Sequence, residues 1–152
     1  MGGPRKINKL SNLSNRNPSN KFGELTLFET KDGSISLSSE LYKESFHSFK
    51  GAKSESIIKF LNPSGIKNLG QNRKVNILDV CFGIGYNSAS IFEELLSKSI
   101  TANWWGLEID RRPIDLVLRN SNFKRNWSYE VISILEEIKA SGEFLRKNLQ
   151  GK

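Results

Sequence analysis

A short apolar run over residues 75–80 passes directly into a turn that contains two glycines, Gly83 and Gly85. The run is rich in β-branched residues and too short for a helix, which is typical of a buried parallel strand. A helical pattern follows over 86–98, and a second buried strand is predicted over 103–110. A strand, a glycine turn, a helix and a second strand in this order open a doubly wound sheet, so the sequence predicts the α/β class.

The rest of the chain divides into segments by the same criteria. Alternating apolar and polar residues on both sides of an Asp-Gly pair predict a β-hairpin over 24–38. Apolar residues at helical intervals predict a helix over 47–61, ahead of a βαβ unit over 75–120. The segment 128–149 has a mostly helical pattern, and no third parallel strand is recognised in it. We therefore expect a single domain over 22–152.

Residues 1–21 form a basic tail that carries five Lys or Arg side chains and no acidic residue. The whole chain has a net charge of +7, so most of its excess charge lies in this tail. The tail is rich in Asn and Ser and has almost no apolar periodicity, which predicts disorder. Such an arm can contact the phosphate backbone of a nucleic acid, or it can be a solubilising leader without a partner. Charge alone gives the leader a small advantage.

Composition excludes several kinds of site. One Cys and one His cannot form a disulfide framework or a conventional His/Cys metal centre, so no metal is expected. No apolar run approaches the roughly 20 residues that span a bilayer, and no signal peptide is recognised. We therefore expect a cytoplasmic protein with no membrane association.

The glycine turn and the acid after the second strand together indicate a nucleotide-type cofactor. The helix N-terminus behind Gly85 presents unpaired N–H groups, and Glu108 can accept hydrogen bonds from both hydroxyls of an adenosine ribose. The dinucleotide pattern requires a third glycine where this chain has Ser88, and there is no Gly-Lys-Ser/Thr of a P-loop. A dinucleotide-dependent oxidoreductase is therefore the less favoured alternative.

Asp79, Gly83 and Gly85 resemble the first motif of the class I methyltransferases that use S-adenosylmethionine. That motif runs acid-x-Gly-x-Gly-x-Gly, so Cys81 stands at the position of its first glycine. We expect Cys81 to be a small buried core residue rather than a reactive thiol. The resemblance implies that Gly83 and Gly85 cradle the cofactor, that Asp79 holds the turn, and that Asp110 lies near the adenine.

Two further motifs resemble those of the MnmC-like tRNA methyltransferases. The run 30–37 looks like the T-x-D-G-S-x-T-L hairpin of that family, whose glycine turn is typically followed by Asn, here Asn87. The family's H-S-x-x-G-A-x-x-E signature is matched by His47-Ser48, Gly51-Ala52 and Glu55. The family completes 5-methylaminomethyl-2-thiouridine at the tRNA wobble position. The resemblance therefore implies S-adenosylmethionine as cofactor and tRNA as partner.

The resemblance also implies that His47, Ser48 and Glu55 line the cofactor pocket, with Glu55 bound to the methionine ammonium. Each of these residues has a simpler interpretation that stays open. His47 can be a structural hydrogen-bonding group, Ser48 can cap the following helix, and Glu55 can be a solvated surface acid.

The family's acidic D-x-F-S/A-P motif, which carries its chemistry, is absent from the sequence, so we assign no catalytic residue. We expect an N-terminal β-hairpin and the first half of a Rossmann-like methyltransferase sheet, apparently truncated and inactive alone. Two alternatives remain besides the oxidoreductase. The chain can be a non-catalytic fragment that binds S-adenosylmethionine or tRNA, or half of a split enzyme whose sheet a second chain completes.

Overall fold

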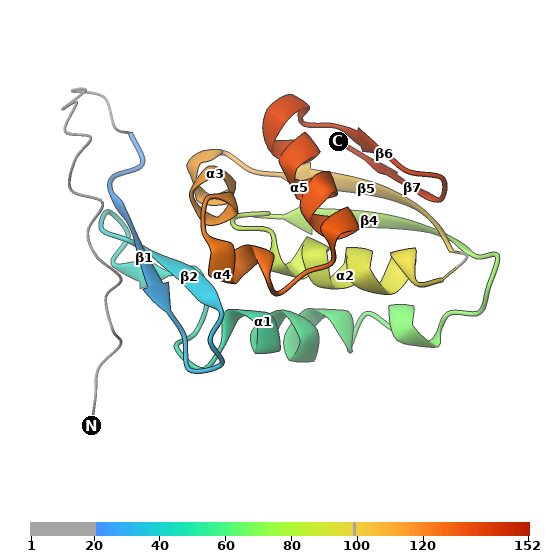
Figure 1. Cartoon of the computed structure of the whole chain (residues 1–152), viewed down its shortest axis with the longest axis horizontal. Helices are drawn as coiled ribbons and strands as arrows, with labels where there is room; N and C mark the ends of the chain where they lie inside the picture. Colours follow the sequence, from blue (N-terminus) through green and yellow to red (C-terminus); the bar gives the residue numbers. More distant parts are fainter. Residues whose placement is uncertain (1–20, 99) are drawn as a thin grey trace.

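The computed structural model describes residues 21–98 and 100–152, which form one small and one larger sheet with helices packed beside them (Figure 1). The basic tail predicted over 1–21 lies outside the described residues except for Lys21. In chain order the elements are β1 (Leu25–Glu29), β2 (Ile35–Ser39), β3 (Glu44–Ser45), α1 (Ala52–Glu55), the π-helical turn η1 (Ser56–Leu61), the 3₁₀ turn η2 (Ile66–Asn68), β4 (Lys74–Val80), α2 (Tyr86–Leu96), β5 (Thr101–Leu107), α3 (Arg112–Leu118), α4 (Ser121–Lys124), α5 (Tyr129–Ser141), β6 (Phe144–Leu145) and β7 (Leu149–Gly151).

The predicted hairpin is confirmed. β1 and β2 pair antiparallel, from Leu25 opposite Ser39 to Glu29 opposite Ile35, and the short strand β3 pairs with β2 on its other side. The Asp-Gly turn places Asp32 at its tip, where the Asp32 carboxylate accepts hydrogen bonds from the hydroxyls of Thr30 and Ser34. The turn chemistry therefore makes this hairpin, as the sequence pattern indicates.

The hairpin turn also caps the next helix. Asp32 Oδ2 accepts hydrogen bonds from the backbone N–H of Ser54 at 3.0 Å and from its hydroxyl at 2.7 Å, while the Ala52 N–H donates to Ser34 Oγ at 2.8 Å. These side chains satisfy helix N–H groups that have no partner within the helix. A Cβ atom at Gly51 would lie 2.1 Å from Asp32 Oδ2, so this close approach requires glycine.

The helix predicted over 47–61 begins later than expected. Residues 47–50 form a loop, and the helix starts at Ala52, after Gly51, because the hairpin turn supplies the caps at that point. The helix then continues as η1, in which the Asn62 N–H donates to the Ile57 carbonyl. Among the described residues, no helix has the length and apolar character needed to cross a bilayer.

The larger sheet has the strand order β4-β5-β7-β6. β4, β5 and β7 are parallel, and β6 pairs antiparallel with β7. The unit β4-α2-β5 is the one predicted from the apolar runs and the glycine turn, and the α/β class is confirmed. With the hairpin, this is part of a Rossmann-like domain.

The expectation that 128–149 is mostly helical is wrong at its C-terminal end. α5 stops at Ser141, because Gly142 takes the left-handed conformation (φ 83°) that commonly ends helices. The chain then returns as β6 and β7, which bury Phe144 and Leu149. The expected absence of a third parallel strand is therefore also wrong, since β7 lies parallel to β5.

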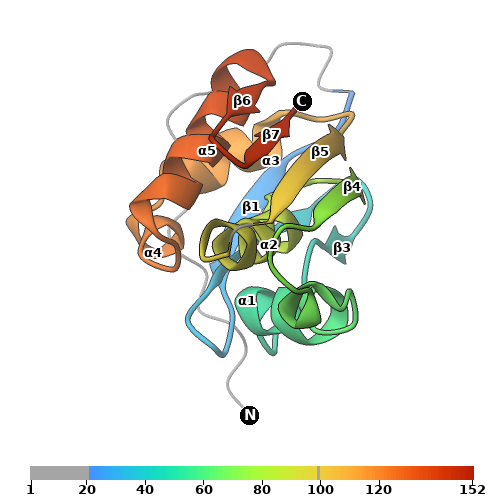
Figure 2. The same ribbon diagram turned by 90° about the vertical axis from the view of Figure 1, so that its right-hand side faces the viewer.

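The helices lie on one side of the larger sheet (Figure 2). The core on that side contains Trp104 of β5, whose ring packs against Phe82, against Phe92 of α2 and against Phe144 of β6. The opposite side of the sheet carries large exposed apolar side chains. We call this side the bare face and define it by Leu78, Val80, Trp105, Leu107 and Leu145.

Candidate cofactor site

In the glycine turn between β4 and α2, every second residue from Cys81 to Gly85 has a left-handed backbone conformation. Gly83 and Gly85 have φ values of 59° and 83°, which residues with a side chain rarely adopt. A Cβ atom at Gly85 would lie 2.9 Å from Cζ of Phe82, so no larger residue fits there without a shift. The turn leaves the N-terminus of α2 directly behind it, as in sites that bind nucleotide cofactors.

Cys81 differs from the expectation of a buried core residue, because it is exposed. It also has a positive φ of 61°, at the position where the methyltransferase motif has its first glycine. The left-handed backbone directs the side chain outward, away from the core. The structure thus gives a physical reason for glycine at this position of the motif.

Asp79 holds the turn through two buried side chains. The Ser88 hydroxyl donates to Asp79 Oδ2 at 2.5 Å, and Trp104 Nε1 donates to the Ser88 oxygen at 2.7 Å. Burial raises the pKa of Asp79, and the charge of Glu108 adds to this rise, although the bond from Ser88 opposes it. The role of Ser88 is not among the sequence predictions, and its only signal in the sequence is its place where a dinucleotide site has its third glycine.

Glu108 follows the last residue of β5 and turns toward the glycine turn. The Gly83 N–H donates to Glu108 Oε2 at 2.6 Å, while the N–H groups of Ile109 and Asp110 donate to Oε1 at 2.8 and 2.9 Å. A carboxylate offers about four lone pairs, so these three donors leave one acceptor position on Oε2. The structure thus orients the predicted ribose acid through backbone groups.

Asp110 pairs with the side chain of Arg112. Arg112 Nε and Nη2 donate to the Asp110 carboxylate at 2.7–3.1 Å, and Arg112 Nη1 donates to the Gly23 carbonyl at 2.8 Å. The hydrogen bond from Arg112 lowers the pKa of Asp110, although partial burial opposes the shift. The pair joins the end of β5 to the segment before β1, and the predicted contact of Asp110 with adenine stays a prediction.

The loop over residues 46–48 lies against the glycine turn. A Cβ atom at Gly83 would meet Phe46 Cδ1 at 3.2 Å, and the His47 ring stands edge-on to the ring of Tyr86, with centroids 5.2 Å apart. His47 Nδ1 lies 3.4 Å from the Ser36 hydroxyl. Burial lowers the pKa of His47, although the charges of Glu55 and Asp32 oppose this. The structure therefore brings the predicted His47 to the predicted turn.

Glu55 is engaged inside its own segment. Its Oε2 accepts a hydrogen bond from the Ser48 N–H at 2.8 Å, and its Oε1 pairs with Lys59 Nζ at 2.5 Å. Burial would raise the pKa of Glu55, but the bonds from Lys59 and Ser48 outweigh it and lower the pKa. Glu55 thus ties the loop to the helix, and its predicted contact with a methionine ammonium stays a prediction, as does a pocket-lining role for Ser48.

Asn87 lies in the first turn of α2, two residues after Gly85. Its Oδ1 atom is buried and accepts no hydrogen bond from any described residue. A buried amide oxygen without a partner costs about 1–3 kcal/mol, so its position calls for a donor from outside the described residues. An orphaned acceptor beside the glycine turn fits a ligand that carries an N–H or ammonium group.

The described residues contain no group of three or more His, Cys, Asp or Glu side chains that could hold a metal ion. No family model matches the chain. An uncharacterised protein of Methanocaldococcus jannaschii, MJ0670, is 45% identical over 65 residues, which are 43% of this chain and 17% of that protein.

The crystal structure of MnmC2 from Aquifex aeolicus is similar to this chain with a TM-score of 0.66 and 28% identity. The likeness covers 86% of this chain and 42% of the other, in its N-terminal part. This chain therefore spans less than half the length of that protein. It has an MnmC-like methyltransferase fold, which confirms the resemblance seen in the motifs.

Proposed function

We propose that this chain, which has the fold of the N-terminal part of an MnmC-like methyltransferase, binds S-adenosylmethionine and serves the methylation of tRNA. The observation that carries the proposal is the 2.6 Å hydrogen bond from the Gly83 N–H to Glu108. This bond holds the acid at the end of the second parallel strand over the glycine turn, which is the arrangement that an adenosine ribose requires.

The residues of the site fit this cofactor. The remaining acceptor position of Glu108 suits a ribose hydroxyl, and the orphaned Asn87 Oδ1 suits the ammonium group of the methionine part. Gly83 and Gly85 let the backbone approach the ligand, while Asp79 and Ser88 keep the turn in place. When bound, S-adenosylmethionine supplies a methyl group on a sulfonium centre for transfer to an amine.

The proposed substrate is the aminomethyl group of a modified uridine at the tRNA wobble position. This finer proposal rests on the resemblance of the hairpin and of the His47-Ser48 motif to the family. The chemistry asks mainly for positioning, because a neutral amine in line with the methyl group reacts without covalent help from the protein. We assign no residue to accept the proton of the amine.

Isothermal titration with S-adenosylmethionine tests the cofactor proposal, with NAD as the control ligand. We expect binding of the first and none of the second, because Ser88 fills the place of the third dinucleotide glycine with a hydrogen-bonded side chain. Binding of NAD alone would favour the oxidoreductase and would reject the proposal.

The affinity of variants at Glu108 and Glu55 for S-adenosylmethionine tests where the ribose binds. Glu108→Ala should weaken binding by about 10- to 100-fold, since a hydrogen bond to a charged group contributes about 1.5–3 kcal/mol. Glu55→Ala is the comparison, because its carboxylate is already engaged with Ser48 and Lys59. Glu108→Gln keeps one oxygen that can accept the hydrogen bond from the Gly83 N–H, so it controls for a folding defect. Equal losses in both alanine variants would show that the ribose lies elsewhere.

Turnover is a separate measurement. We expect no transfer from labelled S-adenosylmethionine to tRNA bearing the aminomethyl intermediate when this chain is tested alone. β4 is an edge strand within the described residues, whereas doubly wound sheets bind ligands where strands continue on both sides of the switch point. Measurable turnover would contradict this and would direct attention to the acids of α5, Glu130, Glu136 and Glu137.

A further inference from the structure

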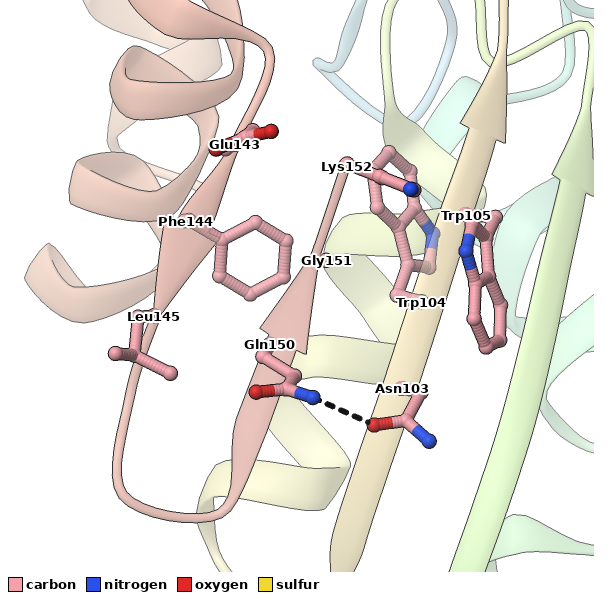
Figure 3. A pocket seen from close by; sticks show the side chains of 9 residues that line it. All are labelled: Asn103, Trp104, Trp105, Glu143, Phe144, Leu145, Gln150, Gly151 and Lys152. Atoms are coloured by element: carbon pink, nitrogen blue, oxygen red, sulfur yellow. Dashed lines mark hydrogen bonds between the residues drawn. The ribbon is translucent and has the colours of Figure 1, made fainter.

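The bare face is apolar over its central part. The side chains of Leu78, Val80, Leu107 and Leu145 are each more than half exposed, and Trp105 is 37% exposed. The strand register places Leu78 opposite Trp105 and Val80 opposite Leu107, whereas Leu145 lies beyond β7, opposite Gln150. Figure 3 shows Trp105 and Leu145 at a depression of about 570 Å³ between β5 and the β6–β7 hairpin.

A parallel sheet is normally covered on both faces, because crossover connections place helices on each side. Here β4, β5 and β7 are parallel, and the described helices lie on the other side of the sheet (Figure 2). A contiguous group of large exposed apolar side chains on a folded protein marks an interaction site. The bare face is therefore expected to be covered by protein.

The edge of the sheet points to the same conclusion. Within residues 21–98 and 100–152, the seven-residue strand β4 pairs only with β5, so its other edge presents unpaired backbone N–H and C=O groups. Proteins protect such edges with charges, proline or bulges, but the charged residues of β4 are Lys74 at its first residue and Asp79, whose carboxylate accepts a hydrogen bond from Ser88 of α2, and its ladder of pairs is regular. This edge can accept a further strand.

A ladder of amide side chains crosses the bare face beside its apolar part. Asn103 Nδ2 donates to Asn76 Oδ1 at 2.9 Å, and Gln150 Nε2 donates to Asn103 Oδ1 at 3.0 Å, as Figure 3 shows for the second bond. These amides satisfy each other in part, which lowers the cost of covering them. The bare face can thus be buried along its full width.

We propose that the β4 edge and the bare face form a docking surface for a polypeptide segment that resembles the C-terminal part of an MnmC-like methyltransferase, and that this segment binds when it is supplied as a separate chain. The similar Aquifex aeolicus protein matches this chain over 42% of its length, in its N-terminal part, so more than half of that protein lies outside the matched part. The docked segment adds a strand parallel to β4 and lays apolar helix faces on Leu78 and Trp105. This inference rests on the fold, so a negative cofactor titration would leave it standing.

The test is co-expression of this chain with the part of Aquifex aeolicus MnmC2 that follows the matched residues. Size-exclusion chromatography with light scattering should give a one-to-one complex. Amide hydrogen exchange should slow by about 100-fold at the free edge of β4, since exchange there would require the complex to open. A complex without protection of β4, or no complex, would overturn the proposal.

Matched variants check the surface. Leu78→Asp should raise the dissociation constant at least about tenfold, because a charge would be buried at the centre of the interface. The control is Ile58→Asp, which alters a side chain of similar exposure (65% against 62%) in η1, outside the bare face. Leu145→Asp is a second variant at the far end of the face. Equal effects of Leu78→Asp and Ile58→Asp would overturn the proposal, and so would a stable dimer of this chain alone that protects β4.

Discussion

Replacing Cys81 by glycine should stabilise the protein. Cys81 has a φ of 61°, and a left-handed backbone costs a residue with a Cβ atom about 1–2 kcal/mol. The side chain is exposed, so little packing is lost on its removal. Glycine adds freedom to the unfolded chain, which costs about 0.4–1 kcal/mol. The midpoints of the two ranges, about 1.5 and 0.7 kcal/mol, leave a net gain in the free energy of unfolding of about 0.8 kcal/mol.

Urea unfolding of the wild type and of Cys81→Gly measures this gain, and the melting temperature should rise by roughly 1–4 °C. Cys81→Ala keeps the Cβ atom and removes only the thiol, so it should match the wild type. Lys43→Gly is the second control, because Lys43 is exposed and has a φ of 52° but is not part of the glycine turn. It should give a similar gain in stability without any change in cofactor affinity.

Cys81→Gly should also bind S-adenosylmethionine at least as tightly as the wild type, because it removes a side chain from the turn that approaches the ligand. Two results would refute the reasoning. One is a loss of stability in Cys81→Gly, which would mean that the thiol makes a stabilising contact. The other is an equal gain in Cys81→Ala, which would mean that the backbone at this position is not strained.

Two further predictions rest on hydrogen bonds described above, and a third rests on the composition of the basic tail. Partial burial raises the pKa of Asp32, but hydrogen bonds from Ser34, Ser54 and Thr30 outweigh it and hold the pKa below its ordinary value of 3.8. The Asp32 carboxylate therefore stabilises the protein above that pH. Asp32→Asn should cost about 1 kcal/mol at pH 7, and melting curves of the two proteins should converge as the pH falls from 5 to 2; a constant difference would contradict the assignment. Ser88→Ala leaves Asp79 and Trp104 Nε1 without their shared partner and should cost about 1–3 kcal/mol in urea unfolding, whereas a neutral effect would mean that water replaces the hydroxyl. Deleting residues 1–21 should leave stability unchanged and, if the tail contacts tRNA, should reduce the salt dependence of tRNA binding; an unchanged salt slope would identify the tail as a leader without a partner.

The elements that the sequence predicted well are those whose signal is local. The hairpin follows from its Asp-Gly pair, and β4 and β5 follow from apolar runs of sufficient length. β7 has three residues beside Arg146 and Lys147, so it carries no periodicity and depends on burying Leu149 next to Ala102 of β5. The end of α5 at Ser141 could have been anticipated from Gly142, a common helix terminator.

The motif residues of the candidate site could also be found in the sequence, whereas the residues to which they form hydrogen bonds could not. Glu108 was recognised by its place after a strand, but the bond to Gly83 joins residues 25 positions apart and depends on the completed sheet. The start of α1 was misplaced for the same reason, since its caps come from Asp32 and Ser34 in the hairpin. The exposure of Cys81 follows from a backbone angle that residue types alone do not specify.

The position of Trp105 gives the bare face a spectroscopic consequence. Of the three tryptophans, Trp104 and Trp127 are buried on the helix side of the molecule, whereas Trp105 is 37% exposed on the bare face. Indole emission shifts to shorter wavelength when the ring leaves water. The intrinsic fluorescence of the unlabelled chain should therefore contain one component that responds to any protein settling on this side of the sheet, while the other two tryptophans supply a constant background.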